Sequence, residues 1–194
     1  LNGIDSEEII AERIGAEHLL YSVMRISSEN KNGAITFFPE RVIGVAVGEK
    51  DPESGNGAAV GAKTPECLNG KAVGEKIPGI SERVQAFADL MTESGLRCQI
   101  KENILLDQWE KYSMNIIYNL PQAILGTGFG AFYDSENVAA IRDRMFEEVK
   151  AVANAEGIPL ESQGDWRSAC VWKARFSTLQ DLDAGRHTEI EMFA

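Results

Sequence analysis

The sequence is poor in the residues that build metal sites and disulfide frameworks. It has three cysteines and two histidines in 194 residues, and the cysteines lie far apart without a CxxC pair. Zinc sites and disulfide frameworks need such residues at close, regular spacings. We therefore predict neither kind of site, and the dispersed thiols favour a reducing, cytoplasmic location.

Long apolar runs and clusters of basic residues are also missing. No run reaches the roughly 18 apolar residues that a membrane span needs, and no signal-peptide pattern is visible. The formal net charge is −11, whereas binding to a phosphate backbone requires a concentrated positive surface. These absences argue against a membrane or nucleic-acid partner.

A dinucleotide-binding turn is absent too, although one glycine-rich stretch looks similar. The stretch "GNGAAVG" at 55–61 reads G-x-G-x-x-x-G, one residue longer than the fingerprint, and no strand pattern leads into it. The fingerprint works because a strand-to-helix turn aims backbone amides at pyrophosphate. We therefore predict that 50–80 is loop without a phosphate site, and we find no P-loop.

The first part of the chain mixes helix and strand patterns. Residues 6–14 predict a helix with Ser6 as its N-cap, and residues 80–95 predict an amphipathic helix that Gly95 ends. Short stretches rich in β-branched and aromatic residues predict strands at 19–27, 33–40, 41–49 and 97–102.

From residue 103 onwards the strand patterns stop. Helical periodicity covers 104–125, 135–156 and 163–194, with an interruption at Gly185. This change predicts an α/β part followed by an all-α part. The chain also begins at "LNGIDSEE" without a methionine and stops in mid-pattern, so we expect a fragment of a longer protein.

One predicted buried helix has a polar edge. In "DQWEKYSMNIIYNLP", Lys111, Asn115 and Asn119 follow one another at four-residue steps among apolar residues, so they share a slowly drifting stripe. The stripe is either solvated surface or the wall of a cleft. In a cleft, a polar ligand would satisfy its hydrogen-bonding groups. Pro121 predicts a kink or break at Leu120.

A second polar cluster lies in "RFSTLQDLDAGRHTEIE". It is either a capped helix followed by a charged turn or part of a functional site. His187 has no companion at metal-ligand spacing and no serine motif that would make it a triad base. We interpret His187 as structural.

Three blocks of the sequence resemble the ketopantoate reductase family (2-dehydropantoate 2-reductase). "LNGID" resembles the family's Q-N-G segment, with Leu1 in place of glutamine. "WEKYSMNIIYNLP" resembles the block W-x-K-x-x-x-N-x-x-x-N-P, with Leu120 inserted before the proline. "STLQDLDAGRHTEIE" resembles S-M-L-Q-D-…-G-R-x-T-E-I-D. The order and separations also fit, and the similarity spans essentially the whole chain.

The resemblance implies a fold and an activity. Residues 1–102 would be the later part of a Rossmann-type NADP-binding domain, without its first strands and glycine-rich turn, and residues 103–194 a helical domain without its final helices. The family reduces 2-ketopantoate to pantoate with NADPH, a step towards pantothenate and coenzyme A, in a cleft between the domains. We therefore expect the fragment to be inactive by itself.

The resemblance also implies roles for single residues. Lys111 and Glu189 match catalytic residues, and Asn115, Asn119 and Ser177 match residues that hold the substrate. Asn2 matches an asparagine near the nicotinamide ribose, and Glu189 also neighbours the cofactor. An ammonium suits this chemistry, because hydride addition to a ketone builds negative charge on oxygen that a nearby acid can stabilise and protonate.

Alternatives remain beside this interpretation. A further family asparagine, expected about ten residues after Asn119, falls at Gly128 or Phe129. A related reductase of another 2-oxo acid, or a non-catalytic module that uses the cleft for binding or dimerisation, therefore remains open. The oligomeric state is open as well, and a homodimer is one option.

Overall fold

The structure is a computed structural model. It describes residues 3–26, 28–31, 33–37, 44–50, 80–163 and 172–193, with only the backbone described at 28–31, 37 and 192. The chain forms two compact units. Unit 1 contains Asp5–Gln108, and unit 2 contains Trp109–Ala194 together with Asn2–Ile4.

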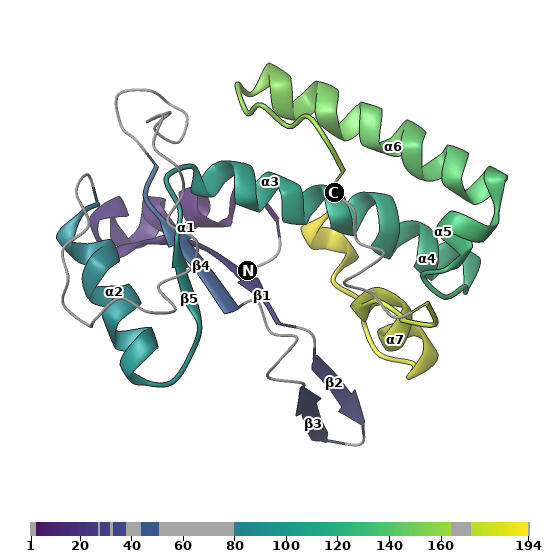
Figure 1. Cartoon of the computed structure of the whole chain (residues 1–194), viewed down its shortest axis with the longest axis horizontal. Coiled ribbons are helices and arrows are strands. Elements are labelled where there is room, and N and C mark those ends of the chain that lie inside the picture. The colour runs from purple at the N-terminus through teal and green to yellow at the C-terminus, as the bar shows by residue number, and fades with distance from the viewer. Residues whose placement is uncertain are drawn as a thin grey trace. The chain divides into compact units, whose positions relative to one another are not determined.

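Unit 1 is built on a three-stranded sheet with the order β1–β4–β5 (Figure 1). Strand β4 (Gly44–Gly48) pairs antiparallel with β1 (Tyr21–Arg25) and parallel with β5 (Cys98–Ile100). A separate hairpin joins β2 (Ser28–Lys31) to β3 (Ala34–Phe37). The predicted strands are present within the described residues, whereas β2 was not predicted because "SENK" lacks the β-branched and aromatic residues typical of strands.

Both faces of this sheet contribute to the core. Val47 packs with Val84 and Ala88 of helix α2 (Glu82–Glu93), while the preceding residue, Ala46, packs with Val23 and Ile104. Successive side chains of a strand point to opposite faces, so the two clusters cover the two sides of β4. Gly95, at φ +76°, follows α2 as predicted.

Helix α1 (Ser6–Ile14) confirms the first predicted helix, but its N-cap is Asp5 and not Ser6, and no side chain caps it. Glu7 of α1 is buried and accepts a hydrogen bond from Gln108 Nε2 at 3.0 Å. Burial raises the pKa of this carboxyl above its usual value. A short 3₁₀ turn, Ala16–His18, follows α1.

A long helical run crosses from unit 1 into unit 2. It consists of α3 (Ile104–Met114), a π-helical turn (Asn115–Asn119) and α4 (Leu120–Leu125). We predicted a kink or a break at Leu120, and Pro121 does not break the run. The Leu120 N–H bonds to the Asn115 carbonyl five residues back, and this π turn, an adjustment often found at kinks, keeps the run continuous up to the proline. Gly126 ends α4 at φ +64°.

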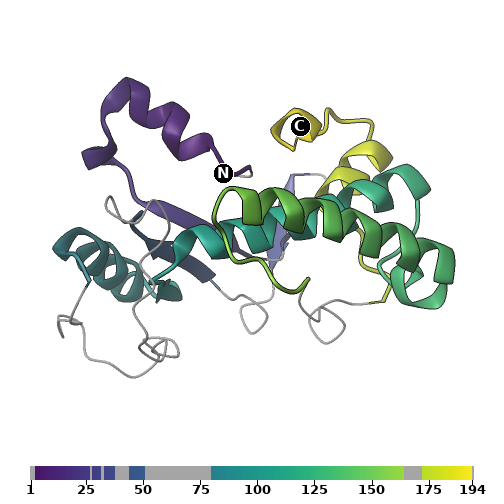
Figure 2. The same ribbon diagram turned by 90° about the horizontal axis from the view of Figure 1, so that it is seen from above.

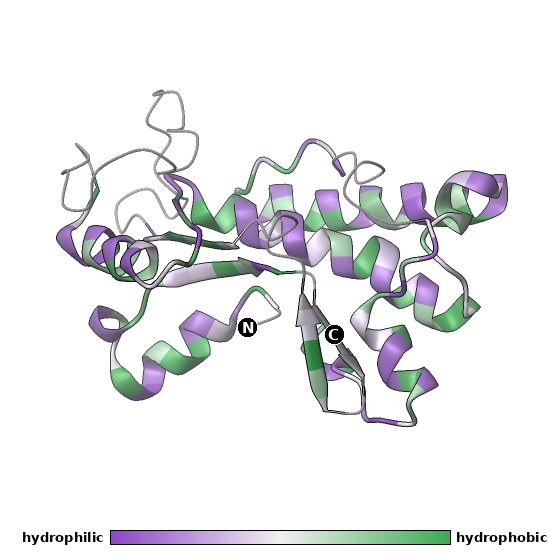
Figure 3. Ribbon diagram, turned by 60° about the horizontal axis from the view of Figure 1, so that its bottom comes forward, coloured by the Kyte–Doolittle hydropathy of each residue, from purple (hydrophilic) through white to green (hydrophobic). Residues whose placement is uncertain are grey.

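The rest of unit 2 packs around this run. Helix α5 (Ala131–Asp134) leads into α6 (Glu136–Ala155), which packs against the π turn (Figures 1 and 2). Polar and apolar segments alternate along α6 in Figure 3, and its buried residues, Phe146, Val149 and Ala153, recur at helical spacing. No helix in the described part of the chain is long and apolar enough to cross a bilayer.

The third predicted helix, over 163–194, is confirmed only in part among the residues that the structure describes. Residues 172–176 are not helical, α7 covers only Ser177–Asp183, and a 3₁₀ turn covers Ile190–Met192. Gly185, at φ +64°, lies just beyond the end of α7. The cause is tertiary, because side chains of the long helical run bond to the backbone at 174–178, as described below.

Candidate functional site

The π turn changes how the predicted polar edge is aligned. A four-residue step in an α-helix exceeds a full turn by about 40°, whereas in a π turn, which holds more residues per turn, the same step falls short of one. The step from Lys111 to Asn115 is α-helical, and the step from Asn115 to Asn119 is π-helical. The two deviations oppose each other, so the π turn brings Asn119 back towards the line of Lys111.

Both asparagines of this edge are buried, with 7% of Asn115 and 2% of Asn119 exposed. This excludes a solvated stripe at these two positions. The Nδ2 atom of Asn115 is buried and has no hydrogen-bond partner in the described part of the chain. A buried donor without a partner is costly, so Asn115 carries a feature that a polar ligand could satisfy.

Asn119 is brought together with Ser177. Its Nδ2 donates to Ser177 Oγ at 3.2 Å, and its Oδ1 accepts from the Thr178 backbone N–H at 3.2 Å. The second bond satisfies one of the N–H groups that the first turn of a helix leaves without a partner. Ser177 itself is exposed. Two predicted substrate-binding residues, 58 positions apart, are therefore hydrogen-bonded neighbours.

Gln122, which the sequence analysis missed, supports the same segment. It is fully buried, its Nε2 donates to the Ala174 carbonyl at 3.0 Å, and its Oε1 accepts from the Phe176 N–H. One signal could have revealed it: Gln122 is a polar residue in the apolar stretch "LPQAIL", three residues after Asn119, and therefore on the same side of a helix.

Lys111 and Glu189 lie in segments that one hydrogen bond connects. Lys111 is half-buried on α3, and the next residue, Tyr112, donates its hydroxyl to the Phe193 carbonyl at 3.1 Å. Glu189 is exposed at the N-cap of the 3₁₀ turn that ends just before Phe193. The segment carrying Glu189 is thus fastened to α3 beside Lys111.

Of the remaining predicted residues, some lie outside the described part of the chain and one is exposed. Asn2 and the glycine-rich stretch at 55–61 lie outside the described residues. His187 is exposed. Among the described residues, no group of three or more His, Cys, Asp or Glu side chains could hold a metal ion.

The segment after α4 is built without the family's further asparagine. Phe129 is fully buried and packs in an aromatic cluster with Tyr118 and Phe176. A Cβ at Gly128 would lie 3.2 Å from the Trp172 carbonyl, so the two backbones approach closely there. Phe129 thus contributes aromatic packing at the place where the resemblance predicts a carboxamide.

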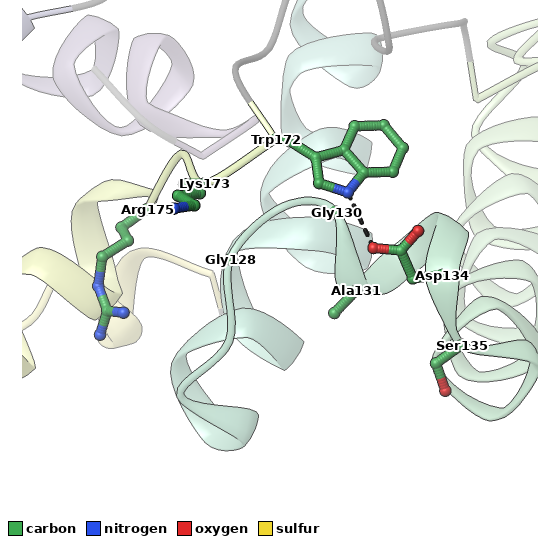
Figure 4. A pocket seen from close by; sticks show the side chains of 8 residues that line it. All are labelled: Gly128, Gly130, Ala131, Asp134, Ser135, Trp172, Lys173 and Arg175. Carbon is green, nitrogen blue, oxygen red and sulfur yellow. Dashed lines mark hydrogen bonds between the residues drawn. The ribbon is translucent and has the colours of Figure 1, made fainter.

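An open pocket of about 520 Å³ lies between this segment and residues 172–175 (Figure 4). Its polar groups are largely occupied: Trp172 Nε1 donates to Asp134 Oδ2 at 2.8 Å, and Arg175 turns away from the indole to pair with Asp183. The pocket therefore shows little that would select a ligand.

An α/β unit followed by a helical unit is similar in fold to solved proteins named ketopantoate reductase or 2-dehydropantoate 2-reductase. The chain aligns over 99% of its length with a 2-dehydropantoate 2-reductase from Geobacter metallireducens (TM-score 0.70, 20% identity, 57% of that chain). It aligns equally far with a PanE/ApbA family ketopantoate reductase from Ralstonia eutropha (TM-score 0.66, 18% identity, 55% of that chain). The predicted fold class, α/β followed by all-α, is confirmed.

Residues 103–194 match the family model described as ketopantoate reductase PanE/ApbA C terminal. The helical part of this chain is therefore similar to that family, and the resemblance seen in the sequence is confirmed. A protein named 2-dehydropantoate 2-reductase from Mesorhizobium japonicum is 30% identical over 114 residues, which are 57% of this chain and 35% of that protein. The chain thus spans about a third of this curated relative and about half of the solved ones.

Proposed function

We propose that the protein containing this chain is an NADPH-dependent reductase that converts 2-ketopantoate to pantoate, a step towards pantothenate and coenzyme A. The observation that carries the proposal is the polar edge of α3 and the π turn. It joins a half-buried lysine, a buried amide donor without a partner in the described residues, and an asparagine bonded to an exposed serine. The match of 103–194 to the reductase family supports the same chemistry.

In this proposal the chain binds the substrate and protonates its oxygen. Asn115 donates to an oxygen of the 2-oxo acid, and Ser177, held by Asn119, binds its hydroxyl or carboxylate group. When bound, NADPH would supply the hydride that the ketone carbon accepts. As negative charge grows on the ketone oxygen, the Lys111 ammonium stabilises that charge and donates a proton, and Glu189 keeps the lysine oriented and charged.

The assignment of NADPH as the cofactor rests on the family resemblance. Within the described residues there is no glycine-rich strand-to-helix turn of the kind that holds pyrophosphate, and Asn2, the other proposed cofactor contact, lies outside them. We still predict that residues 1–102 are part of a Rossmann-type domain and that the 194 residues alone bind NADPH poorly. The activity test therefore uses the whole protein.

Replacing Lys111 tests the proposed acid. In the whole protein, Lys111→Ala should lower ketopantoate-dependent NADPH oxidation by about 10²- to 10⁴-fold, because general-acid help of this kind has that magnitude. The exposed Lys173→Ala, in the same unit, is the matched control and should keep its turnover. Near-normal turnover of Lys111→Ala would remove Lys111 from the chemistry.

A reductase of another 2-oxo acid is the second candidate. The observation that favours it is the place of the missing asparagine, where Phe129 is buried and Gly128 permits only a close backbone approach. Steady-state turnover of the whole protein across a panel of 2-oxo acids separates the two candidates. Activity with other 2-oxo acids and none with ketopantoate would establish the second.

A further inference from the structure

Gln122 holds the backbone that leads into Ser177. Its carboxamide donates to the Ala174 carbonyl and accepts from the Phe176 N–H, so both ends of the side chain are used. None of the Gln122 surface is exposed. It therefore cannot touch a substrate that reaches Ser177 from solvent.

Asn119 and Gln122 act on one short segment. Together they bond to groups of Ala174, Phe176, Ser177 and Thr178. Residues 174–176 are not helical, and the N-cap of α7, Phe176, makes no side-chain capping bond. The place of the Ser177 hydroxyl is consequently set in part by two amides of the long helical run. The Phe129 N–H, which donates to the Ala174 carbonyl, and Gln180 Nε2, which donates to the Arg175 carbonyl, hold the same segment.

We propose that Gln122 is a positioning residue that fixes Ser177 for binding of the 2-oxo acid. This inference rests on the proposed function, because it takes Ser177 as a substrate contact. Loss of the Gln122 carboxamide leaves the Phe176 N–H, next to Ser177, without its acceptor, while the Ala174 carbonyl keeps the bond from Phe129. The backbone at Phe176 then shifts, and the Ser177 hydroxyl leaves its binding position. Displacements of about 1 Å at such a group have large effects on substrate use.

The test is a double-mutant cycle in the whole protein. Gln122→Ala should raise KM for the 2-oxo acid about tenfold, while KM for NADPH changes by less than about twofold. In a Ser177→Ala background the same substitution should have no further effect, because its target is gone. Gln163→Ala, which removes a carboxamide bonded to Asp143, is the control and should leave both KM values unchanged.

An unchanged KM, or equal effects of Gln122→Ala with and without Ser177, would overturn the proposal. Should Gln122→Ala fail to fold, Gln122→Glu keeps the acceptor for Phe176 and loses the donor to Ala174, and the same cycle applies. If the wild-type protein reduces no 2-oxo acid, the proposed function is wrong. Amide exchange then decides on the positioning contact: faster exchange at Phe176 in Gln122→Ala supports it, and unchanged exchange overturns it.

Discussion

Asn115 and Asn119 carry the same carboxamide one turn apart, yet their surroundings differ. Asn119 uses both ends of its amide on Ser177 and Thr178. Asn115 has a buried Nδ2 without a partner in the described part of the chain. A buried donor without a partner adds no stability to the folded protein, which supports a binding role for Asn115. Asn119, whose amide is fully used within the protein, has a mainly positioning role.

Replacing Asn115 should therefore separate stability from function. Asn115→Leu has nearly the same shape, and it removes the unmatched donor, so the free energy of unfolding should stay equal or rise by about 1 kcal/mol. KM for the 2-oxo acid should rise at least about tenfold. Urea denaturation and steady-state kinetics of the whole protein measure the two effects.

The exposed Asn154→Leu on α6 provides the matched control, and its KM should not change. A strong loss of stability together with an unchanged KM would show that the Asn115 amide serves the fold. That result would speak against the proposed substrate contact.

Among the elements, the π turn and α7 differ most from what periodicity predicts. Apolar spacing gives the extent of the long helical run, because each turn needs an apolar side facing the core. It does not distinguish an α turn from a π turn, since both keep the backbone hydrogen-bonded. Helix α7 begins only at Ser177, because Gln122 bonds to the backbone of Ala174 and Phe176 before it and Asn119 accepts from the Thr178 N–H in its first turn.

Helix α6 offers a test at the scale of one element. The Ser135 side chain accepts from the Val138 N–H at 3.4 Å and caps its N-terminus. Ser135→Ala should lower the free energy of unfolding by about 1 kcal/mol, whereas Ser135→Asp should keep most of it, because aspartate is also a good N-cap. Equal stabilities of the alanine and aspartate variants in urea denaturation would show that this cap contributes little.

Over the whole chain, each unit depends on contacts between residues far apart in sequence. In unit 1, Asp107 is buried and lies 3.3 Å from Arg25 Nη2 and 3.1 Å from Lys101 Nζ. These bonds join the start of α3 to β1 and to the residue after β5. Nothing in the local sequence around Asp107 predicts either partner.

Neutralising Asp107 should destabilise unit 1. Asp107→Asn leaves two partly buried cations without their carboxylate and should cost about 2 kcal/mol, below the full penalty of a completely buried pair. Glu148→Gln breaks an exposed pair with Arg144 and should cost less than about 0.5 kcal/mol. Amide exchange in β4 and urea denaturation measure both, and equal effects would show that the Asp107 pairs are as weak as surface pairs.

The sequence by itself determined the order of the elements apart from β2 and α5, the polar edge of the long helix and the family resemblance. It could do so because helical periodicity, strand composition and motif spacing are local properties of the chain. The tertiary structure decided the π turn, the short α7, and the bonds that Asn119 and Gln122 make to residues 174–178. Hydrogen-bond partners more than 50 residues apart depend on where the packed backbone places them, and no local pattern contains that position.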